Sequence, residues 1–537
     1  MRLRSFLSTG AFSVLLWPLL IEPGCQPPPG TTTEAPRPEQ EEPPSAPPTD
    51  PGPASVPDAT VPAITGDMIA LQPPVWGYNA ANLFNNARGT EPVLHNMLAS
   101  MGTRVLRFPG GTLANFYHPE GKGYGLRASD VELVKGSNMY KSMGKSVEKE
   151  AAALANKSMD TDPLEGMIKL AKATGIGVIY VANIFSGTDA EVIGALKRLR
   201  DSGVEIAGVE LGNEHYLRAY RSKFPDVGSY LKRAEQTAKA IKAEFPRVPL
   251  GIVVAPPPDL KGAQGDNADR LDDWNASAAG CSFADAIVLH TYAFPKGCKE
   301  EAQGAELFTC MNTASIEYAS RKLPAALKEL SGLSGGKKPV WITEWNMHDV
   351  FEHFGNTLLQ GLFAADMMFA LSNKSTDKPG QGGVSISTCH NLLADGDGFN
   401  AISVAGKGSG QFNGQVLYHV SSMLKDVLVA GARMRTLPLP AGYEGSTLRL
   451  VQLETGATYL VATARSGKPL SLAGLQLPAG VAVSGKGAVL GANDLLEGVG
   501  DNPVRKGGKL APKALDLSDV RKAELPPYCL VVLKLGT

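Results

Sequence analysis

The chain has 537 residues, of which 43% are hydrophobic and 20% are charged, and its formal net charge is -1. This length exceeds what one hydrophobic core usually holds, so two or more domains are expected, and the composition is typical of a globular protein. A net charge this small, without a long block of like charges, argues against nucleic acid or an anionic membrane surface as a partner.

Residues 1–25 have the anatomy of an export signal. Two arginines in the first four residues precede the apolar run Ala11–Ile21, which is too short to span a bilayer as a helix. The following Glu-Pro-Gly-Cys, ending at Cys25, resembles a bacterial lipoprotein signal, in which the cysteine is lipidated and becomes the mature N-terminus. Plain secretion is the alternative, because Glu22 stands where such signals usually have leucine. We therefore expect an exported bacterial protein, either a cell-envelope lipoprotein or secreted, whose membrane contact is at most this lipid anchor.

Residues 26–63 are predicted to be a disordered linker. Thirteen prolines occur among residues 26–62, together with Thr, Ser and Glu and almost no large apolar side chain. Such a segment cannot bury enough surface to offset its chain entropy, and proline keeps it extended. It would hold a folded domain away from a surface; a leader without function is the alternative.

Residues 64–428 are predicted to form a (β/α)8 barrel of the α/β class. Apolar runs alternate with helical patterns, and eight such strands separated by helices favour a closed barrel. The competing fold is an open doubly wound sheet, but no glycine-rich phosphate turn follows the first strand. The eight runs, each typical of a strand covered on both faces, are Val75–Phe84, Thr103–Gly111, Gly177–Phe185, Ile206–Glu214, Pro249–Pro257, Ala286–Phe294, Pro339–Asn346 and Gly383–Leu393.

Residues 429–537 have a different texture, with short strand patterns separated by turns. The segments STLRLVQLETGATYLVATARSGKPLSL and PPYCLVVLKL predict a C-terminal antiparallel β-sandwich domain. The short segment Gly66–Gln72, ahead of the barrel, is a candidate for an additional edge strand of this domain.

The cysteines fit an exported protein. Cys298 and Cys310 lie in one loop-like stretch and are expected to form a disulfide. Cys281, Cys389 and Cys529 are expected to be buried thiols. The spacing matches no zinc site, so no metal is expected.

Polar residues occur where several predicted barrel strands end. Active sites of such barrels lie at the C-terminal ends of the strands. Taken singly, each of these residues has a structural explanation, such as a solvated rim glutamate, an ion-paired arginine or a core histidine. Their shared placement makes a site the stronger interpretation. On the second, fourth, sixth and seventh strands they are, in order, Arg107; Asn213 and Glu214; His290 and Tyr292; and Glu344.

Glu214 and Glu344 would face each other across the barrel mouth. Two carboxylates in unequal environments can divide the work of glycoside hydrolysis, one as a proton donor and the other as an ionised nucleophile. Arg107 beside one carboxylate would lower its pKa and keep it ionised. Tyr292 would hydrogen-bond the same carboxylate, and the amide of Asn213 would bind a sugar hydroxyl.

The motifs LRFPGG, VELGNE, HTY and TEWN resemble those of the clan A retaining glycoside hydrolases. Within that clan, LRFPGG and VELGNE look most like the family 51 arabinofuranosidases and the family 79 heparanase-like glucuronidases. The resemblance covers the barrel, roughly Val75–Leu393, and the trailing sandwich resembles the C-terminal domain of both families.

The resemblance implies a role for each matching residue. Glu214 would be the general acid/base and Glu344 the nucleophile of a double displacement that needs no cofactor and acts on a carbohydrate. The remaining residues implied to support the nucleophile or to contact the sugar are Arg107, Asn213, His290, Tyr292, Asn79, Asn82, Trp345 and Asn391.

The chain also departs from the clan pattern. The eighth strand ends in Cys-His-Asn-Leu-Leu instead of the usual aromatic platform, and the insert from Tyr117 to about Lys157 matches neither family. The insert is expected to shape the pocket, so the motifs specify neither the sugar nor the number of subunits. No role is assigned to His215 or Tyr216. The competing classes are a surface-tethered carbohydrate-binding protein on an inactive hydrolase scaffold and, more remotely, a structural envelope protein.

Overall fold

The computed structural model describes residues 68–155, 161–260, 268–294, 298, 304–348, 354–373, 383–395, 399–405, 409–499, 508 and 510–536. The expected export signal (1–25) and linker (26–63) lie outside the described residues. In the described part, no helix is both long and apolar enough to cross a lipid bilayer.

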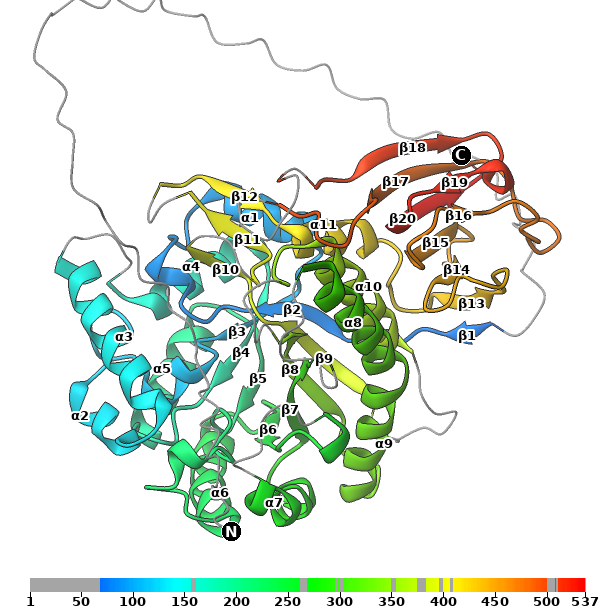
Figure 1. The fold of residues 1–537 in the computed structure, drawn as a ribbon. Coiled ribbons are helices and arrows are strands. Elements are labelled where there is room, and N and C mark those ends of the chain that lie inside the picture. Colours follow the sequence, from blue (N-terminus) through cyan, green and yellow to red (C-terminus); the bar gives the residue numbers. More distant parts are fainter. Residues whose placement is uncertain are drawn as a thin grey trace, which may run out of the picture. The chain divides into compact units, whose positions relative to one another are not determined.

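Eight parallel strands form a closed barrel in chain order, which confirms the predicted fold class (Figure 1). The barrel closes where the first strand pairs with the last, with Tyr78 opposite Cys389. The strands consist almost entirely of buried residues, because helices cover their outer face. Their bounds are β2 (Val75–Asn79), β3 (Val105–Phe108), β4 (Gly177–Val181), β5 (Ile206–Glu210), β6 (Leu250–Val253), β7 (Ala286–Ala293), β8 (Val340–Met347) and β9 (Val384–Cys389).

Most of the predicted strands are too long at their C-terminal ends. The largest difference is in β2, which ends at Asn79 instead of Phe84 and is followed by the 3-10 turn η1 (Leu83–Asn85), and β5 ends at Glu210 instead of Glu214. The apolar pattern continues past the strand ends because loop residues such as Leu211 and Phe84 are also fully buried. Hydrophobicity alone therefore does not mark where a strand becomes a loop.

Helices follow the strands and form the outer layer (Figure 1). Their boundaries have a local cause: Thr188 and Glu191 make a capping box that begins α5, and Gly175, at a left-handed φ of 70°, ends α4. The helices are α1 (Pro92–Ser100), α4 (Pro163–Thr174), α5 (Asp189–Asp201), α6 (Val227–Glu244), α7 (Ala268–Gly280), α8 (Gly304–Glu317), α9 (Leu323–Leu333), α10 (Leu358–Ser372) and α11 (Val416–Leu424).

The insert between β3 and α4 begins with the 3-10 segment η2 (Thr112–Phe116) and contains the helices α2 (Ala128–Val131) and α3 (Asn138–Ala155). Its anchor is the fully buried His118. The Nδ1 atom of His118 lies 2.9 Å from a carboxylate oxygen of Glu191 on α5, and Nε2 lies 2.7 Å from one of Asp130 on α2. The insert is thus attached to the barrel by a buried imidazole between two carboxylates.

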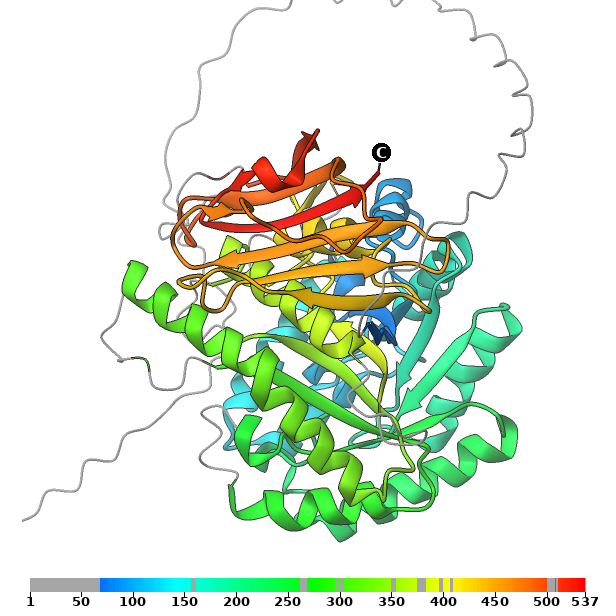
Figure 2. The same cartoon turned by 90° about the vertical axis from the view of Figure 1, so that its right-hand side faces the viewer.

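The C-terminal part is a β-sandwich with a seven-stranded antiparallel sheet in the order β1-β13-β14-β15-β20-β17-β18 (Figure 2). The pairing of β1 with β13 confirms the expected extra edge strand. A two-stranded sheet of β16 and β19 covers one face, and α10 contacts the other. The strands are β1 (Ile69–Ala70), β13 (Arg433–Leu437), β14 (Thr447–Gln452), β15 (Thr458–Arg465), β16 (Leu470–Ser471), β17 (Gly485–Ala492), β18 (Lys513–Leu517), β19 (Glu524–Leu525) and β20 (Tyr528–Leu535).

A small sheet of β10 (Leu393–Asp395), β11 (Ile402–Val404) and β12 (Phe412–Gly414) follows the last barrel strand. A disulfide joins Cys298 and Cys310, so the segment after β7 is linked to α8. Of the other described cysteines, Cys389 and Cys529 are buried and Cys281 is half-buried.

Candidate active site

The C-terminal ends of five barrel strands bring polar side chains to one place. Strands contribute Asn79 (β2), Arg107 (β3), His290 and Tyr292 (β7), and Glu344 (β8). Asn213 and Glu214 follow β5 in a turn. Of the ten residues named from the sequence as catalytic or substrate-binding, these seven are the ones that the structure brings together.

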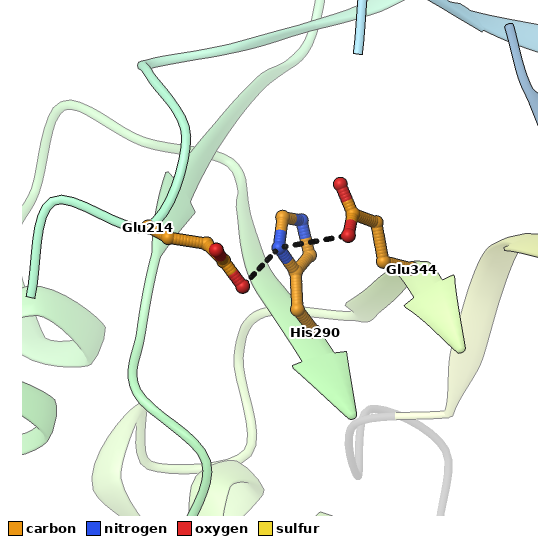
Figure 3. Close-up of side chains that lie close together, drawn as sticks. All are labelled: Glu214, His290 and Glu344. Carbon is orange, nitrogen blue, oxygen red and sulfur yellow. Dashed lines mark hydrogen bonds and ion pairs between the residues drawn. The ribbon is translucent and has the colours of Figure 1, made fainter. Parts of the chain in front are cut away.

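The two glutamates lie on either side of an imidazole (Figure 3). One carboxylate oxygen of Glu214, one of Glu344 and a ring nitrogen of His290 are all within 4.8 Å of one another. The Glu344 side chain is 6% exposed, whereas that of Glu214 is 19% exposed. The pair therefore combines a short separation with unequal access to solvent.

Arg107 holds three partners of this group with one guanidinium. Its Nη1 donates to Glu344 at 2.6 Å, and its Nη2 donates to the Oδ1 of Asn213 at 2.8 Å. Its Nε donates at 2.8 Å to Glu210, the fully buried last residue of β5. The planar fork of an arginine suits this geometry, which an ammonium group could not reproduce.

Glu344 is surrounded by donors on both carboxylate oxygens. Asn79 donates to Oε1 at 3.0 Å, in addition to Arg107, and the hydroxyl of Tyr292 donates to Oε2 at 2.6 Å. Burial by itself raises the pKa of the Glu344 carboxyl, but the positive charges of His290 and Arg107 outweigh burial and hold the pKa well below its usual range. Glu344 is therefore ionised at neutral pH.

His290 is the fully buried neighbour of both glutamates. Its Nδ1 lies 3.2 Å from Oε1 of Glu214, and its Nε2 lies 3.2 Å from the hydroxyl of Thr343. Burial by itself lowers the pKa of His290, but the negative charges of Glu344 and Glu214, together with the hydrogen bond to Glu214, outweigh burial and raise the pKa above its usual value.

The turn that carries Glu214 explains its unusual neighbours in the sequence. The hydroxyl of Tyr216 donates to Glu214 at 3.1 Å, whereas His215 points away and packs on Phe185 and Phe224. A Cβ on Gly212, which has a φ of +95°, would lie 2.2 Å from the ring of His215. Only glycine satisfies both the left-handed backbone and this close contact.

Three residues named from the sequence do not join the group. Trp345 points to the outer layer, where its Nε1 donates to Ser387 and its ring packs near Phe363, because neighbouring strand residues face opposite sides. The Oδ1 of Asn391 accepts from the backbone N–H of Leu393 in its own loop. Asn82 is half-buried, three residues beyond β2, and none of the hydrogen bonds just described includes it.

Glu210 and His390 contact the charged residues of the site and were missed in the sequence. Glu210 pairs with Arg107, as described above, and its position four residues before Glu214 on a buried strand was the available signal. His390 follows β9, and its Nδ1 lies 3.1 Å from the amide of Asn79 and 3.8 Å from a carboxylate oxygen of Glu344. With 31% of its side chain exposed, His390 lies at the end of the eighth strand, where the sequence Cys-His-Asn-Leu-Leu departs from the usual aromatic platform.

The same three groups, Glu214, His290 and Glu344, are close enough to bind one cation between them. However, the guanidinium of Arg107, 2.6 Å from Glu344, already supplies a positive charge there. A second cation would be repelled by this charge, so the group fits a carboxylate pair better than a metal centre.

Solved structures of glycoside hydrolases share the fold. A family 51 α-L-arabinofuranosidase from Bifidobacterium longum has a TM-score of 0.62 and 14% identity, covering 88% of this chain and 97% of its own. The family 51 arabinofuranosidase from Xanthomonas axonopodis pv. citri has a TM-score of 0.59 and 13% identity, covering 87% and 98%. A 4-O-α-L-rhamnosyl-β-D-glucuronidase from Fusarium oxysporum 12S has a TM-score of 0.52 and 12% identity, covering 88% and 99%. No protein-family model and no curated protein matches the sequence. These likenesses establish a barrel with an attached β-sandwich.

Proposed function

We propose that the protein is a retaining glycoside hydrolase in which Glu344 is the nucleophile and Glu214 is the general acid/base. The observation that carries the proposal is the pair of carboxylates with oxygens within 4.8 Å at the C-terminal end of the barrel. Retaining glycosidases hold their two carboxyl groups about 5–5.5 Å apart, whereas inverting enzymes need about 6.5–9.5 Å to admit a water.

In the first step, a carboxylate oxygen of Glu344 attacks the anomeric carbon while the bond to the leaving oxygen breaks. Glu214 gives its proton to that oxygen, and a glycosyl–Glu344 ester remains. In the second step, Glu214 takes a proton from water, the water oxygen attacks the anomeric carbon, and Glu344 leaves as a carboxylate. The low pKa of Glu344 supports its role as the ionised partner.

The neighbouring residues support this division of roles. Arg107, Asn79 and Tyr292 orient the carboxylate of Glu344. The Oδ1 of Asn213 accepts from Arg107, and no described residue accepts a hydrogen bond from its buried Nδ2, so this donor remains for the sugar 2-hydroxyl. Hydrogen bonds to that hydroxyl strengthen in the transition state.

A panel of aryl glycosides tests the proposal, beginning with arabinofuranosides and glucuronides, the substrates named for the structurally similar enzymes. Glu344→Gln is expected to lose at least about 10³-fold in kcat because it removes the nucleophile, while sugar binding by calorimetry persists. Glu454→Gln, on the β-sandwich, is the control and should keep full activity. A wild type that binds sugars but hydrolyses none of the panel would contradict the proposal and favour a carbohydrate-binding protein.

We also propose that the protein is exported and lipidated at Cys25. The support is the signal-like N-terminal sequence and the proline-rich stretch after it. Mass spectrometry of the mature protein from a bacterial host should find an N-terminal diacylglyceryl-cysteine, and a Cys25→Ser variant should lose it. A mature chain beginning elsewhere without lipid would show plain secretion.

A further inference from the structure

Glu214 is the one member of the carboxylate–imidazole group that no strand carries. Figure 3 shows His290 and Glu344 on strands, whereas Glu214 projects from a turn. Glu214 itself has a φ of +52°, and Gly212 has a φ of +95°. A non-glycine residue in the left-handed region is strained and persists only where its surroundings hold it there.

The side chain of Asn115 contacts the residue between these two positions at both of its backbone groups. Its Nδ2 donates to the carbonyl oxygen of Asn213 at 2.7 Å, and the backbone N–H of Asn213 donates to its Oδ1 at 3.1 Å. Asn115 is fully buried and Asn213 is 1% exposed, so water does not compete for these hydrogen bonds. The carboxamide thus fixes one peptide segment from two sides.

Asn115 is itself fixed from outside the turn. It belongs to η2, and its carbonyl oxygen accepts a hydrogen bond from the hydroxyl of Ser186 at 3.0 Å. The backbone N–H of Ser186 donates in turn to Asn183 at 2.9 Å, and the amide of Asn183 donates to the carbonyl of Tyr117 at 3.0 Å. The loop after β4 therefore supports η2, and η2 supports the turn that carries Glu214.

We infer that Asn115 is the positioning residue of the general acid/base; the inference rests on the proposed function of Glu214. Asn115 acts through the backbone of Asn213 and sets the direction in which the next side chain points. Glu344 does not depend on it, because Arg107, Asn79 and Tyr292 hold that carboxylate. We call the two hydrogen bonds between the Asn115 carboxamide and the backbone of Asn213 the clamp. Loss of the clamp should impair proton transfer by Glu214 and leave the orientation of Glu344 unchanged.

A series of aryl glycosides with leaving groups of different pKa distinguishes these two effects. The sugar is one that the wild type hydrolyses, and the variants are Asn115→Ala and the isosteric Asn115→Asp, whose carboxylate would face the carbonyl of Asn213. We expect kcat/KM to fall about 10²-fold for leaving groups of high pKa, the effect of a displaced acid. For dinitrophenolate, which leaves without a proton, we expect less than about a fivefold change, since general acid catalysis is not needed there.

The rate of turnover in the presence of azide gives a second measurement, which would not change if Asn115 had a purely structural role. With a dinitrophenyl substrate, an impaired base slows the attack of water on the glycosyl–enzyme, and a small anion that needs no base can replace the water. Azide should therefore accelerate turnover by the Asn115 variants and leave the wild type unchanged.

The chain offers a matched control in Asn275. Its carboxamide also pairs with both backbone groups of one residue, Ala255, at 2.8 and 2.9 Å, and it is also buried. Asn275→Ala removes an equivalent clamp after β6, so it should lower stability comparably and show neither the leaving-group dependence nor the response to azide.

Each outcome decides between the claims. A wild type inactive on every glycoside would contradict the proposed function. With an active wild type, an equal loss across all leaving groups, or no response to azide, would overturn the role of Asn115 alone. Failure of both Asn115 variants to fold while Asn275→Ala folds would also overturn it, because it would show that Asn115 serves folding.

Discussion

At the scale of single residues, the central feature of the site is one buried arginine that pairs with two buried carboxylates. Arg107 forms ion pairs with Glu210 and Glu344. Water does not compete for these ion pairs, since all three side chains are at most 6% exposed. Its positive charge is therefore divided between two carboxylates. Glu344, the proposed nucleophile, is kept ionised without being neutralised by a partner of its own, which suits a carboxylate that would attack and later leave.

The raised pKa of His290 predicts how stability changes with pH. A group whose pKa is higher in the folded state contributes stability that is fully present below its unfolded pKa, about 6.5 for histidine, and is lost as the pH rises through the folded value. The unfolding free energy of the wild type relative to His290→Gln should therefore be largest at acidic pH and decline above about pH 6.5. Urea unfolding of the wild type and of His290→Gln between pH 5 and 9 measures this difference in unfolding free energy.

His419 provides the opposite control. Burial lowers the pKa of His419, so its folded form binds fewer protons than the unfolded chain, and its effect on stability should run the other way with pH. The same series with His419→Gln should show a relative stability that rises with pH. Equal slopes for the two variants would contradict the assigned environment of His290.

At the scale of elements, the buried imidazole of His118 attaches the insert to α5 and α2. His118→Phe removes both contacts and leaves Glu191 and Asp130, each at most 15% exposed, without this partner. We expect the unfolding free energy to fall by about 3 kcal/mol, because removing one partner of a buried ion pair leaves the charge of the other partner uncompensated. Chemical unfolding measures the loss, and proteolysis within residues 119–155 should become faster.

The comparison for that variant is His95→Phe. Within the described residues, the imidazole of His95 makes one hydrogen bond, from its Nε2 to the carbonyl of Gly89 at 2.9 Å. Its loss should cost about 1 kcal/mol. Similar losses for His95→Phe and His118→Phe would show that His118 does not anchor the insert.

The elements also show how far a sequence can be interpreted. Capped helices such as α5 and the order of the barrel strands follow from local patterns. Six of the seven site residues that come together follow from their place at predicted strand ends, and Asn79 was implied by the family resemblance. The turn at Glu214 does not, because the side chain that bonds the backbone of Asn213 beside it belongs to Asn115, which lies 98 positions before Asn213 in the sequence. The outward orientation of Trp345 could have been predicted, because neighbouring strand residues face opposite sides and Glu344 faces the site.

At the scale of the whole molecule, α10 connects the barrel to the β-sandwich. Every residue of α10 except Ala370 is buried, since the helix packs on barrel strands and on strands of the seven-stranded sheet. Its Asp366 accepts from Arg465 at 2.9 Å and from Arg449 at 3.2 Å, and both arginines lie on the sheet. The predicted boundary between residues 428 and 429 therefore separates two parts that pack against each other and are joined by buried ion pairs.

Asp366→Asn tests this connection. It leaves two buried guanidinium groups without their shared countercharge, so we expect the unfolding free energy to fall by about 3–5 kcal/mol. Asp519→Asn, whose ion pair with Arg521 lies at the surface, should have little effect. If both variants unfold at the same denaturant concentration as the wild type, the two parts are not coupled through Asp366.

The central claim is that Glu344 and Glu214 work as a retaining pair. Proton NMR of the first sugar released from a hydrolysed glycoside reports the anomeric configuration before mutarotation, and it tests this claim most directly. One oxygen of each carboxylate lies within 4.8 Å of the other, and this short separation predicts a first product with the anomeric configuration of the substrate. A first product of inverted configuration would contradict the account.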